Sequence, residues 1–340
     1  MFIQHIRFIS NICCLNAYYT YAFSYWQENM TLQIRSFKAQ DLSTLVKLLN
    51  EARQGSYEFI PLTEEEVSAR IQEGKSSVLI AEKDGEIVGS ATYNDGYWGE
   101  EIRWLGVRGG PDQKLTEDAL VKKAEELVRK GTVFISVDAG SPRTNEWIDR
   151  GYAPSGGLYQ MIAKLDSPRI LPTLPEGFRV GSMKLGEEQE VIATVNAVFG
   201  WDRLKPDFVE KGKVDSPPFS EEWVHVAYHG SKVVSVVVAW PAAKFNAYFG
   251  AKRGYLGPAA TLSDYRAKKL ASALTVRAMN FLFEKGFDQV VLHTSELNVP
   301  SVTLLRNVGL KVGHHIKFLK KSVPPKDQVN LNLIDERPEN

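Results

Sequence analysis

The stretch Thr261-Leu-Ser-Asp-Tyr-Arg-Ala-Lys-Lys-Leu-Ala-Ser-Ala-Leu274 decides how the fold of this chain is interpreted. It ends a run over residues 254–262 that predicts a β-strand, and it opens an amphipathic helix. The first N–H groups of a helix have no partner within it, and the positive end of the helix dipole lies there. Arg266, Lys268 and Lys269 add three cations at that point. The stretch therefore predicts a site for a phosphate group, such as the pyrophosphate of a cofactor.

A solvated basic helix start is the plain alternative for this cluster. Cations at a helix N-terminus oppose the helix dipole, so a purely structural sequence tends to avoid them there. A bound anion would relieve the conflict, and for that reason we expect phosphate binding at this turn.

The chain repeats itself once, at an offset of 146 residues. The match preserves residue class and the order strand–helix–strand. Matching positions include Ile34 with Val180, Leu45 with Val191, and Val78 with Val224. We therefore expect two copies of one α/β domain.

In each copy the sequence pattern predicts, in order, a short strand, an amphipathic helix, a variable region, two strands joined by a turn, and a further strand. A long helix, another strand and a last short helix complete it. The expected bounds are 41–53 and 187–199 for the first helices, 78–82 with 87–93 and 224–228 with 233–240 for the joined strands, 116–129 and 268–285 for the long helices, and 133–137 and 289–294 for the strands after them.

Composition limits the partners and the compartment that the sequence predicts for this protein. Lys+Arg and Asp+Glu balance at 41 each in 340 residues, so no global charge favours nucleic acid or an anionic membrane. The only cysteines, Cys13 and Cys14, form neither a disulfide framework nor a zinc-ligand pattern, which fits a cytoplasmic protein without a metal site. Residues 8–26 carry no charge, which raises the alternative of a membrane span, but polar residues interrupt them.

These observations predict five segments. The expected divisions are an N-terminal extension outside the fold over residues 1–29, a first copy over 31–165, a linker with three prolines over 166–177, a second copy over 178–322, and a tail over 323–340.

Over residues 31–320 the whole pattern resembles the GCN5-related N-acetyltransferase (GNAT) superfamily, in a tandem form similar to mycothiol-synthase-like acetyltransferases. The family signature is Arg/Gln-x-x-Gly-x-Gly/Ala at the helix start. Arg266 and Ala271 fit its ends, whereas Lys269 stands where glycine is usual. Asn298 and Gly309-Leu310 match the downstream pattern. The resemblance implies an α/β (α+β) fold of two GNAT-like domains, each a mixed, mostly antiparallel central sheet flanked by helices.

The resemblance also implies acetyl-CoA as co-substrate, bound between two separating strands. A backbone N–H at Thr261 or Leu262 would polarise the thioester carbonyl. Glu296, just past the second of these strands, is the expected base, and His293 on that strand ranks lower. Leu305 stands where many family members have a tyrosine that protonates the departing thiolate. The expected cofactor-binding residues are Thr261, Leu262, Arg266, Ala267, Lys268, Lys269, Leu270, Ala271, Asn298 and Ser301.

The functional interpretation has an alternative at two positions. Asn298 and the residues after it equally fit a cap of the last helix. In the first copy, Thr116 is the expected N-cap of the long helix, with Glu117 and Asp118 in its first turn. Such carboxylates would repel a pyrophosphate, so we expect that the first copy has lost acetyl-CoA binding.

The sequence therefore predicts a cytoplasmic, acetyl-CoA-dependent N-acetyltransferase, monomeric or homodimeric, whose catalytic site lies in the second copy. The expected acceptor is a primary amine on a small molecule or peptide, with neither nucleic acid nor membrane as partner. The alternatives are a non-catalytic acyl-CoA-binding or sensing protein, and an acyltransferase that uses a different acyl-CoA.

Overall fold

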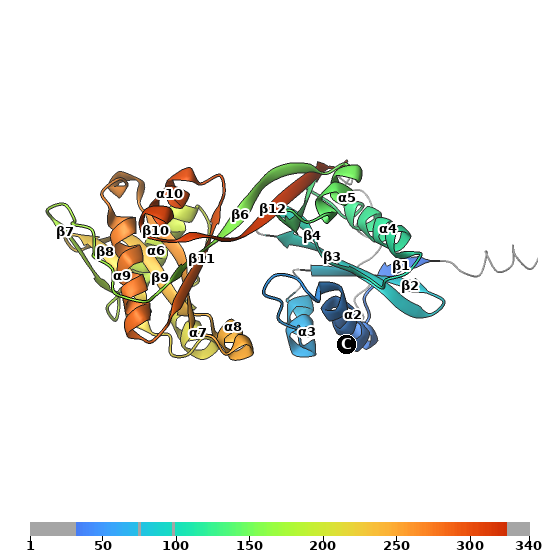
Figure 1. The fold of residues 1–340 in the computed structure, drawn as a ribbon, viewed down its shortest axis with the longest axis horizontal. Coiled ribbons are helices and arrows are strands. Elements are labelled where there is room, and N and C mark those ends of the chain that lie inside the picture. Colours follow the sequence, from blue (N-terminus) through green and yellow to red (C-terminus); the bar gives the residue numbers. More distant parts are fainter. Residues whose placement is uncertain (1–31, 74–75, 97–98, 325–340) are drawn as a thin grey trace, which may run out of the picture. The chain divides into compact units, whose positions relative to one another are not determined.

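A computed structural model describes residues 32–73, 76–96 and 99–324 of the chain (Figure 1). The expected extension over residues 1–29 and nearly all of the expected tail lie outside these ranges. The described chain forms two compact units. The first contains the residues up to Ser136, Asn145–Ala153 and those from Leu319 on, and the second contains Val137–Thr144 and Pro154–Phe318.

The first unit is built on a sheet in the order β1-β2-β3-β4-β5. Its strands are antiparallel neighbours except for β4 and β5, which run parallel. Leu45 and Leu49 of α2 pack against the buried residues Val78 and Ile80 of β2. The elements are β1 (Gln33–Ser36), α2 (Leu42–Arg53), α3 (Glu64–Gln72), β2 (Ser76–Lys83), β3 (Glu86–Gly96), β4 (Gly99–Val107), α4 (Gln113–Glu125), β5 (Thr132–Asp138) and α5 (Arg143–Asp149).

Helix α4 begins three residues earlier than the sequence suggests. Its N-cap is Asp112, so Thr116 lies inside the helix, where it is buried. Glu117 and Asp118 lie beyond the first turn and both pair with Arg150, at 3.3 and 2.8 Å. The expectation that Thr116 caps this helix was therefore wrong, because the helix continues backward to the polar turn after Gly110. One carboxylate, that of Asp112, still stands at the helix start.

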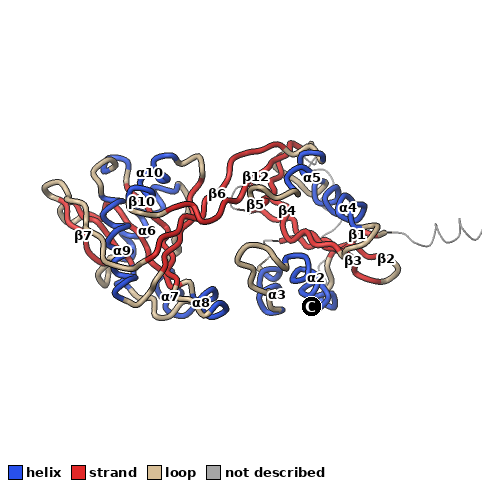
Figure 2. Tube along the Cα trace, in the orientation of Figure 1, coloured by secondary structure: helices blue, strands red, loops and turns tan. Residues whose placement is uncertain are grey.

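The second unit has the strand order β12-β6-β11-β10-β9-β8-β7. Strand β6, at the end of the first copy in sequence, pairs through its residues Leu158–Lys164 with the whole of β11. Figures 1 and 2 show α9 running alongside the strands of this unit. The elements are β6 (Ala153–Lys164), β7 (Phe178–Ser182), α6 (Glu188–Phe199), α7 (Phe208–Asp215), β8 (Val224–His229), β9 (Lys232–Pro241), α8 (Ala243–Phe249), β10 (Arg253–Thr261), α9 (Leu270–Glu284), β11 (Gln289–Ser295), α10 (Val299–Asn307) and β12 (Lys311–Ser322).

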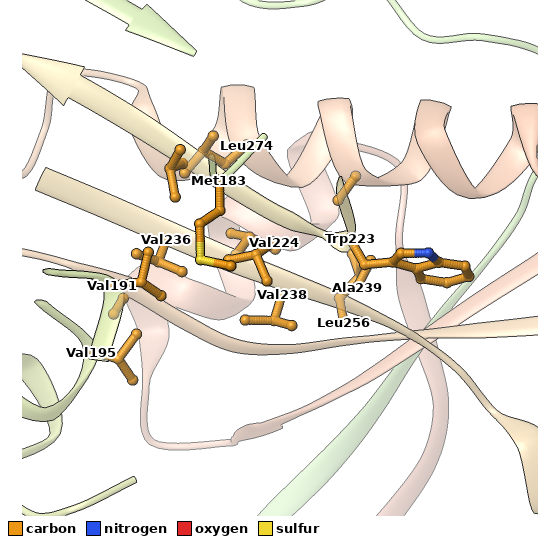
Figure 3. Packing of buried hydrophobic residues seen from close by; sticks show 14 of the residues in the cluster. Met183, Val191, Val195, Trp223, Val224, Val236, Val238, Ala239, Leu256 and Leu274 are labelled. Carbon is orange, nitrogen blue, oxygen red and sulfur yellow. The ribbon is translucent and has the colours of Figure 1, made fainter. Parts of the chain in front are cut away.

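The core of the second unit lies on both faces of β9. Consecutive residues Val233–Ala239 are all buried, which is the pattern of a strand covered on each side. Figure 3 shows Val191 and Val195 of α6 near Val236 and Val238 of β9. Gly254 of β10 faces α9, because a Cβ at this position would lie 2.5 Å from a Leu282 side-chain carbon. Helices α6 and α9 therefore cover opposite faces.

The predicted fold class is confirmed: each unit has a mixed, mostly antiparallel sheet flanked by helices. The expected helices and strands of both copies are present within a few residues of their expected bounds. Helix α8, inserted between β9 and β10, was not expected, because its seven residues follow a proline and lack a clear apolar period. Among the described residues, no helix combines the length and apolar character needed to cross a bilayer.

Candidate functional site

The decisive feature of the second unit is the separation of β10 from β11. The two parallel strands pair only at their first three residues, the last pair being Tyr255 with Val291. Beyond that point β10 continues against β9 as far as Thr261, and β11 continues against β6 as far as Ser295. The second halves of β10 and β11 therefore leave their facing backbone edges unpaired with each other. In the first unit, β4 and β5 also pair at only two positions.

One backbone donor on β10 faces this opening. The N–H of Leu262 donates to the carbonyl of Val234 at 3.0 Å, so the Leu262–Val234 pair is hydrogen-bonded. Hydrogen-bonded and non-bonded pairs alternate along an antiparallel ladder, so the neighbouring Thr261–Ser235 pair is of the other kind. The N–H of Thr261 consequently points away from β9, toward the β11 side. Of the two expected donors, the Leu262 N–H is engaged and the Thr261 N–H is not engaged with β9.

A strained turn joins β10 to α9. Both Ala267 and Lys269 adopt the left-handed conformation, with φ of 61° and 62°, which favours glycine. Lys269 is the N-cap of α9, and the first bond along the helix runs from the Ala273 N–H to the Lys269 carbonyl. The N–H groups of residues 270–272 therefore have no acceptor within the helix.

The three predicted cations surround this helix start. Arg266 and Lys269 are exposed and Lys268 is half-buried. The Arg266 Nε donates to the Thr261 carbonyl at 3.3 Å, which draws the guanidinium toward the end of β10. Within the described part of the chain, none of the three cations forms an ion pair with a carboxylate. The turn thus combines uncompensated positive charge with unpaired N–H groups, which is the donor set that binds a phosphate anion.

Aromatic packing holds the turn in place. Tyr265, just before Arg266, packs against the rings of Phe178 and His229, with centroids 6.1 and 5.5 Å apart. Lys232 lies over the Tyr265 ring at 5.8 Å. These contacts come from β7 and the β8–β9 hairpin, so the sheet itself fixes the position of the cationic turn.

Glu296 lies just past the end of β11, but its carboxylate is engaged. The Lys317 Nζ donates to it at 2.9 and 3.2 Å, and the His315 ring nitrogen lies 2.6 Å from it. Desolvation by burial raises the pKa of this carboxyl, but the hydrogen bonds from Lys317 and His315 outweigh it and hold the pKa below its usual value. A carboxylate with a lowered pKa is a weak acceptor of protons, which disfavours Glu296 as the general base.

Asn298 and Ser301 have local structural bonds. The Asn298 side chain accepts from the Ser301 N–H at 3.2 Å and so caps α10. The Ser301 hydroxyl lies 3.0 Å from that of Thr294 on β11. Both residues stand at the end of β11, across the opening from the cationic turn. Leu305 is buried in the core of the unit.

The structure adds one position that the sequence did not single out, Gly257. The β9–β10 register shifts between Leu256 and Ala259, so this part of β10 bulges beside the point of strand separation. The Trp240 Nε1 donates to the Gly257 carbonyl at 2.6 Å and fixes the bulge. The Gly257-Pro258 dipeptide was its only sequence signal. No three His, Cys, Asp or Glu side chains of the described ranges gather as metal ligands.

The left-handed turn carries a stability prediction. Lys269→Gly and Ala267→Gly should each raise the free energy of unfolding by about 0.5–1 kcal/mol, because relief of Cβ strain exceeds the added entropy of the unfolded chain. Lys268→Gly is the matched control, since Lys268 has no positive φ and its replacement should lower stability. Urea denaturation measures all three. Equal destabilisation by Lys268→Gly and Lys269→Gly would contradict the left-handed turn.

Comparison with known proteins agrees with this geometry. Residues 189–310 match the family described as "Acetyltransferase (GNAT) family". Mycothiol acetyltransferase of Thermobispora bispora is 26% identical over 167 residues, which are 47% of this chain and 55% of that protein. Mycothiol acetyltransferase of Saccharomonospora viridis is 25% identical over 155 residues, 41% of this chain and 48% of that protein. The chain thus spans about half the length of the curated relatives it matches.

Solved structures show the same fold. A GCN5-related N-acetyltransferase from Sphaerobacter thermophilus has a TM-score of 0.60 at 19% identity, covering 86% of this chain and 96% of that one. A tandem GNAT protein from the clavulanic acid biosynthesis pathway has a TM-score of 0.62 at 14% identity, covering 87% and 100%. Residues 189–310 thus match the GNAT family, and the chain is similar to mycothiol acetyltransferases over nearly half of its length, in agreement with the resemblance expected from the sequence.

Proposed function

We propose that the second unit binds acetyl-CoA and transfers its acetyl group directly to a primary amine. The observation that carries the proposal is the cationic, left-handed turn placed directly at the open edge of β10. Arg266, Lys268 and Lys269 supply charge there, and the first N–H groups of α9 supply directed hydrogen bonds. The GNAT match over residues 189–310 covers this turn and both separating strands.

In this proposal the pantetheine arm lies along the unpaired edge of β10, and the pyrophosphate lies at the turn. The Thr261 N–H, which points away from β9, is the donor available to the thioester carbonyl or to the arm. The acceptor amine attacks in its uncharged form, so it must first lose a proton. A small-molecule amine or the amine of a peptide fits this chemistry equally.

The test is direct. Acetyl-CoA should stabilise the full chain in a thermal-shift titration, and desulfo-CoA should do the same because it keeps the pyrophosphate. Thiol release should then appear with at least one amine in a panel of glucosamine, spermidine, tyramine and a lysine peptide. Absence of any shift with either nucleotide would refute acetyl-CoA binding.

A non-catalytic acyl-CoA-binding protein is the second candidate. It is favoured by two observations: Leu305 is buried where a thiolate-protonating tyrosine is common, and Glu296 is tied to Lys317 and His315. Stabilisation by acetyl-CoA without thiol release from any amine would support this candidate. Stabilisation by succinyl-CoA beyond that by acetyl-CoA would instead favour an acyltransferase for a different acyl group.

A further inference from the structure

In the second unit, the side chains of Tyr255 and His293 lie beside the point where β10 and β11 separate. Gly254 faces α9, so the next residue, Tyr255, lies on the opposite face. Tyr255 is level with Val291 on the parallel neighbour β11, and His293 follows two residues later on that same face. The rings of Tyr255 and His293 are 5.9 Å apart, one on each of the two separating strands.

This face also carries an aromatic wall. Trp240 of β9 lies directly opposite Tyr255 in the antiparallel register, so both rings project from the face away from α9. The Trp240 ring stacks on Phe219 with centroids 4.0 Å apart, and Gly212 of α7 fits against both rings. A Cβ at Gly212 would lie 2.6 Å from Phe219 and 2.8 Å from Trp240. The aromatic wall formed by Trp240 and Phe219 is thus closely packed, beside the bulge at Gly257.

Two candidates for proton transfer lie on β11 or just past its end. Glu296 accepts hydrogen bonds from Lys317 and lies against His315. His293 is exposed on its strand and contacts the Tyr255 ring. An imidazole exchanges its proton near neutral pH, which suits a group that must first take a proton and then give it up. The position of His293 beside the strand separation and the chemistry of its imidazole together favour it over Glu296 as the proton-transfer group.

We infer that His293 is the proton-transfer residue of the acetyl transfer, with Tyr255 positioning its ring; this inference rests on the proposed function. The amine nitrogen forms a bond to the acetyl carbon while the carbon–sulfur bond breaks, and the sulfur leaves with the electron pair. The proton lost by the nitrogen passes to the His293 imidazole, which then delivers it to the thiolate. Free CoA and the N-acetylated amine result, so atoms and charge balance. His293 thereby performs two roles, that of a separate base and that of the tyrosine that many family members have at the position of Leu305.

Chemical labelling tests the position of His293 without relying on activity. Diethyl pyrocarbonate modifies accessible imidazoles, and peptide mass mapping reports each site. Acetyl-CoA at saturation should reduce labelling of His293, whereas His314, bonded to Asp138 on another strand, should keep its labelling. Unchanged labelling of His293 in protein that acetyl-CoA stabilises would show that His293 lies away from the bound thioester.

Kinetics test the role. With the fastest amine of the panel, His293→Gln should lower kcat/KM about 100-fold and remove the rise of kcat/KM with pH that a proton-accepting imidazole produces. His314→Gln should keep both rate and pH profile. Tyr255→Phe should keep the pH profile, because it keeps the ring. A His293→Gln variant that retains rate and profile overturns the inference while the proposed function stands; a wild-type protein that releases no thiol refutes the function itself.

Discussion

Reversing two charges at the turn before α9 should abolish most acetyl-CoA binding. In Arg266→Glu/Lys268→Glu we expect the dissociation constant to rise about 100-fold or more. Each charge-assisted hydrogen bond to a phosphate contributes about 1.5–3 kcal/mol, and about 1.4 kcal/mol is a tenfold change in affinity. The two carboxylates would also repel the pyrophosphate at the positive end of the helix. Isothermal titration calorimetry at fixed salt measures the change.

A matched variant separates this local effect from net charge. Arg306→Glu/Lys311→Glu makes the same change in charge at two exposed positions after β11, at the end of α10 and the start of β12. Its affinity for acetyl-CoA should stay close to that of the wild type. If both double variants bind alike, the phosphate does not lie at the Arg266–Lys269 turn. Wild-type affinity should also weaken as salt rises, because screening acts on exposed cations.

The repeat made most of the fold predictable from sequence. Apolar positions recur at matching places in both copies, and periodicity distinguishes helices from strands without tertiary information. The ends of helices were less certain. Thr116 has the residue type of an N-cap, yet α4 starts at Gln113, because the preceding turn places Asp112 at the cap position. Local residue type does not determine which of two neighbouring polar residues caps a helix.

The site was predictable where backbone and sequence carry the same signal. The cations at 266, 268 and 269 and the helix after them could be recognised without coordinates. Lys269 departs from the family glycine, yet it keeps the left-handed conformation that glycine would adopt. The environment of Glu296 could not be predicted, because Lys317 and His315 come from β12, which lies two strands away across β6. Contacts of that kind depend on strand order.

Below neutral pH the second unit should lose stability through one buried histidine. His225 of β8 is fully buried on the α9 face, and neither ring nitrogen has a hydrogen-bond partner in the described structure. Desolvation by burial, followed by the nearby charge of Arg277, lowers its pKa from 6.5 to about 3. Above pH 6.5 the ring is neutral in both folded and unfolded chains. Below it only the unfolded chain takes up the proton, so stability falls as pH falls toward 3.

Denaturation at two pH values measures the effect. Between pH 8 and pH 5 the free energy of unfolding should drop by about 2 kcal/mol from this residue, since one unit of pKa shift corresponds to about 1.4 kcal/mol. His225→Phe should remove that drop, because phenylalanine has no proton to gain and can pack against Phe281 as the imidazole does. The interval also lies above the ordinary pKa of glutamate carboxyls, about 4.3, and the hydrogen bond from Lys213 lowers the pKa of Glu221 further.

A second variant separates the two causes. Because desolvation is the larger contribution to the lowered pKa of His225, Arg277→Met should remove only the smaller part of the drop, whereas His225→Phe removes all of it. If charge repulsion were dominant, the two variants would behave alike. If His225→Phe kept the wild-type drop, the ring would have to be solvated or hydrogen-bonded in solution. Burial on the face that α9 covers predicts the opposite, since a protonated imidazole there would need a partner that none of the neighbouring described side chains provides.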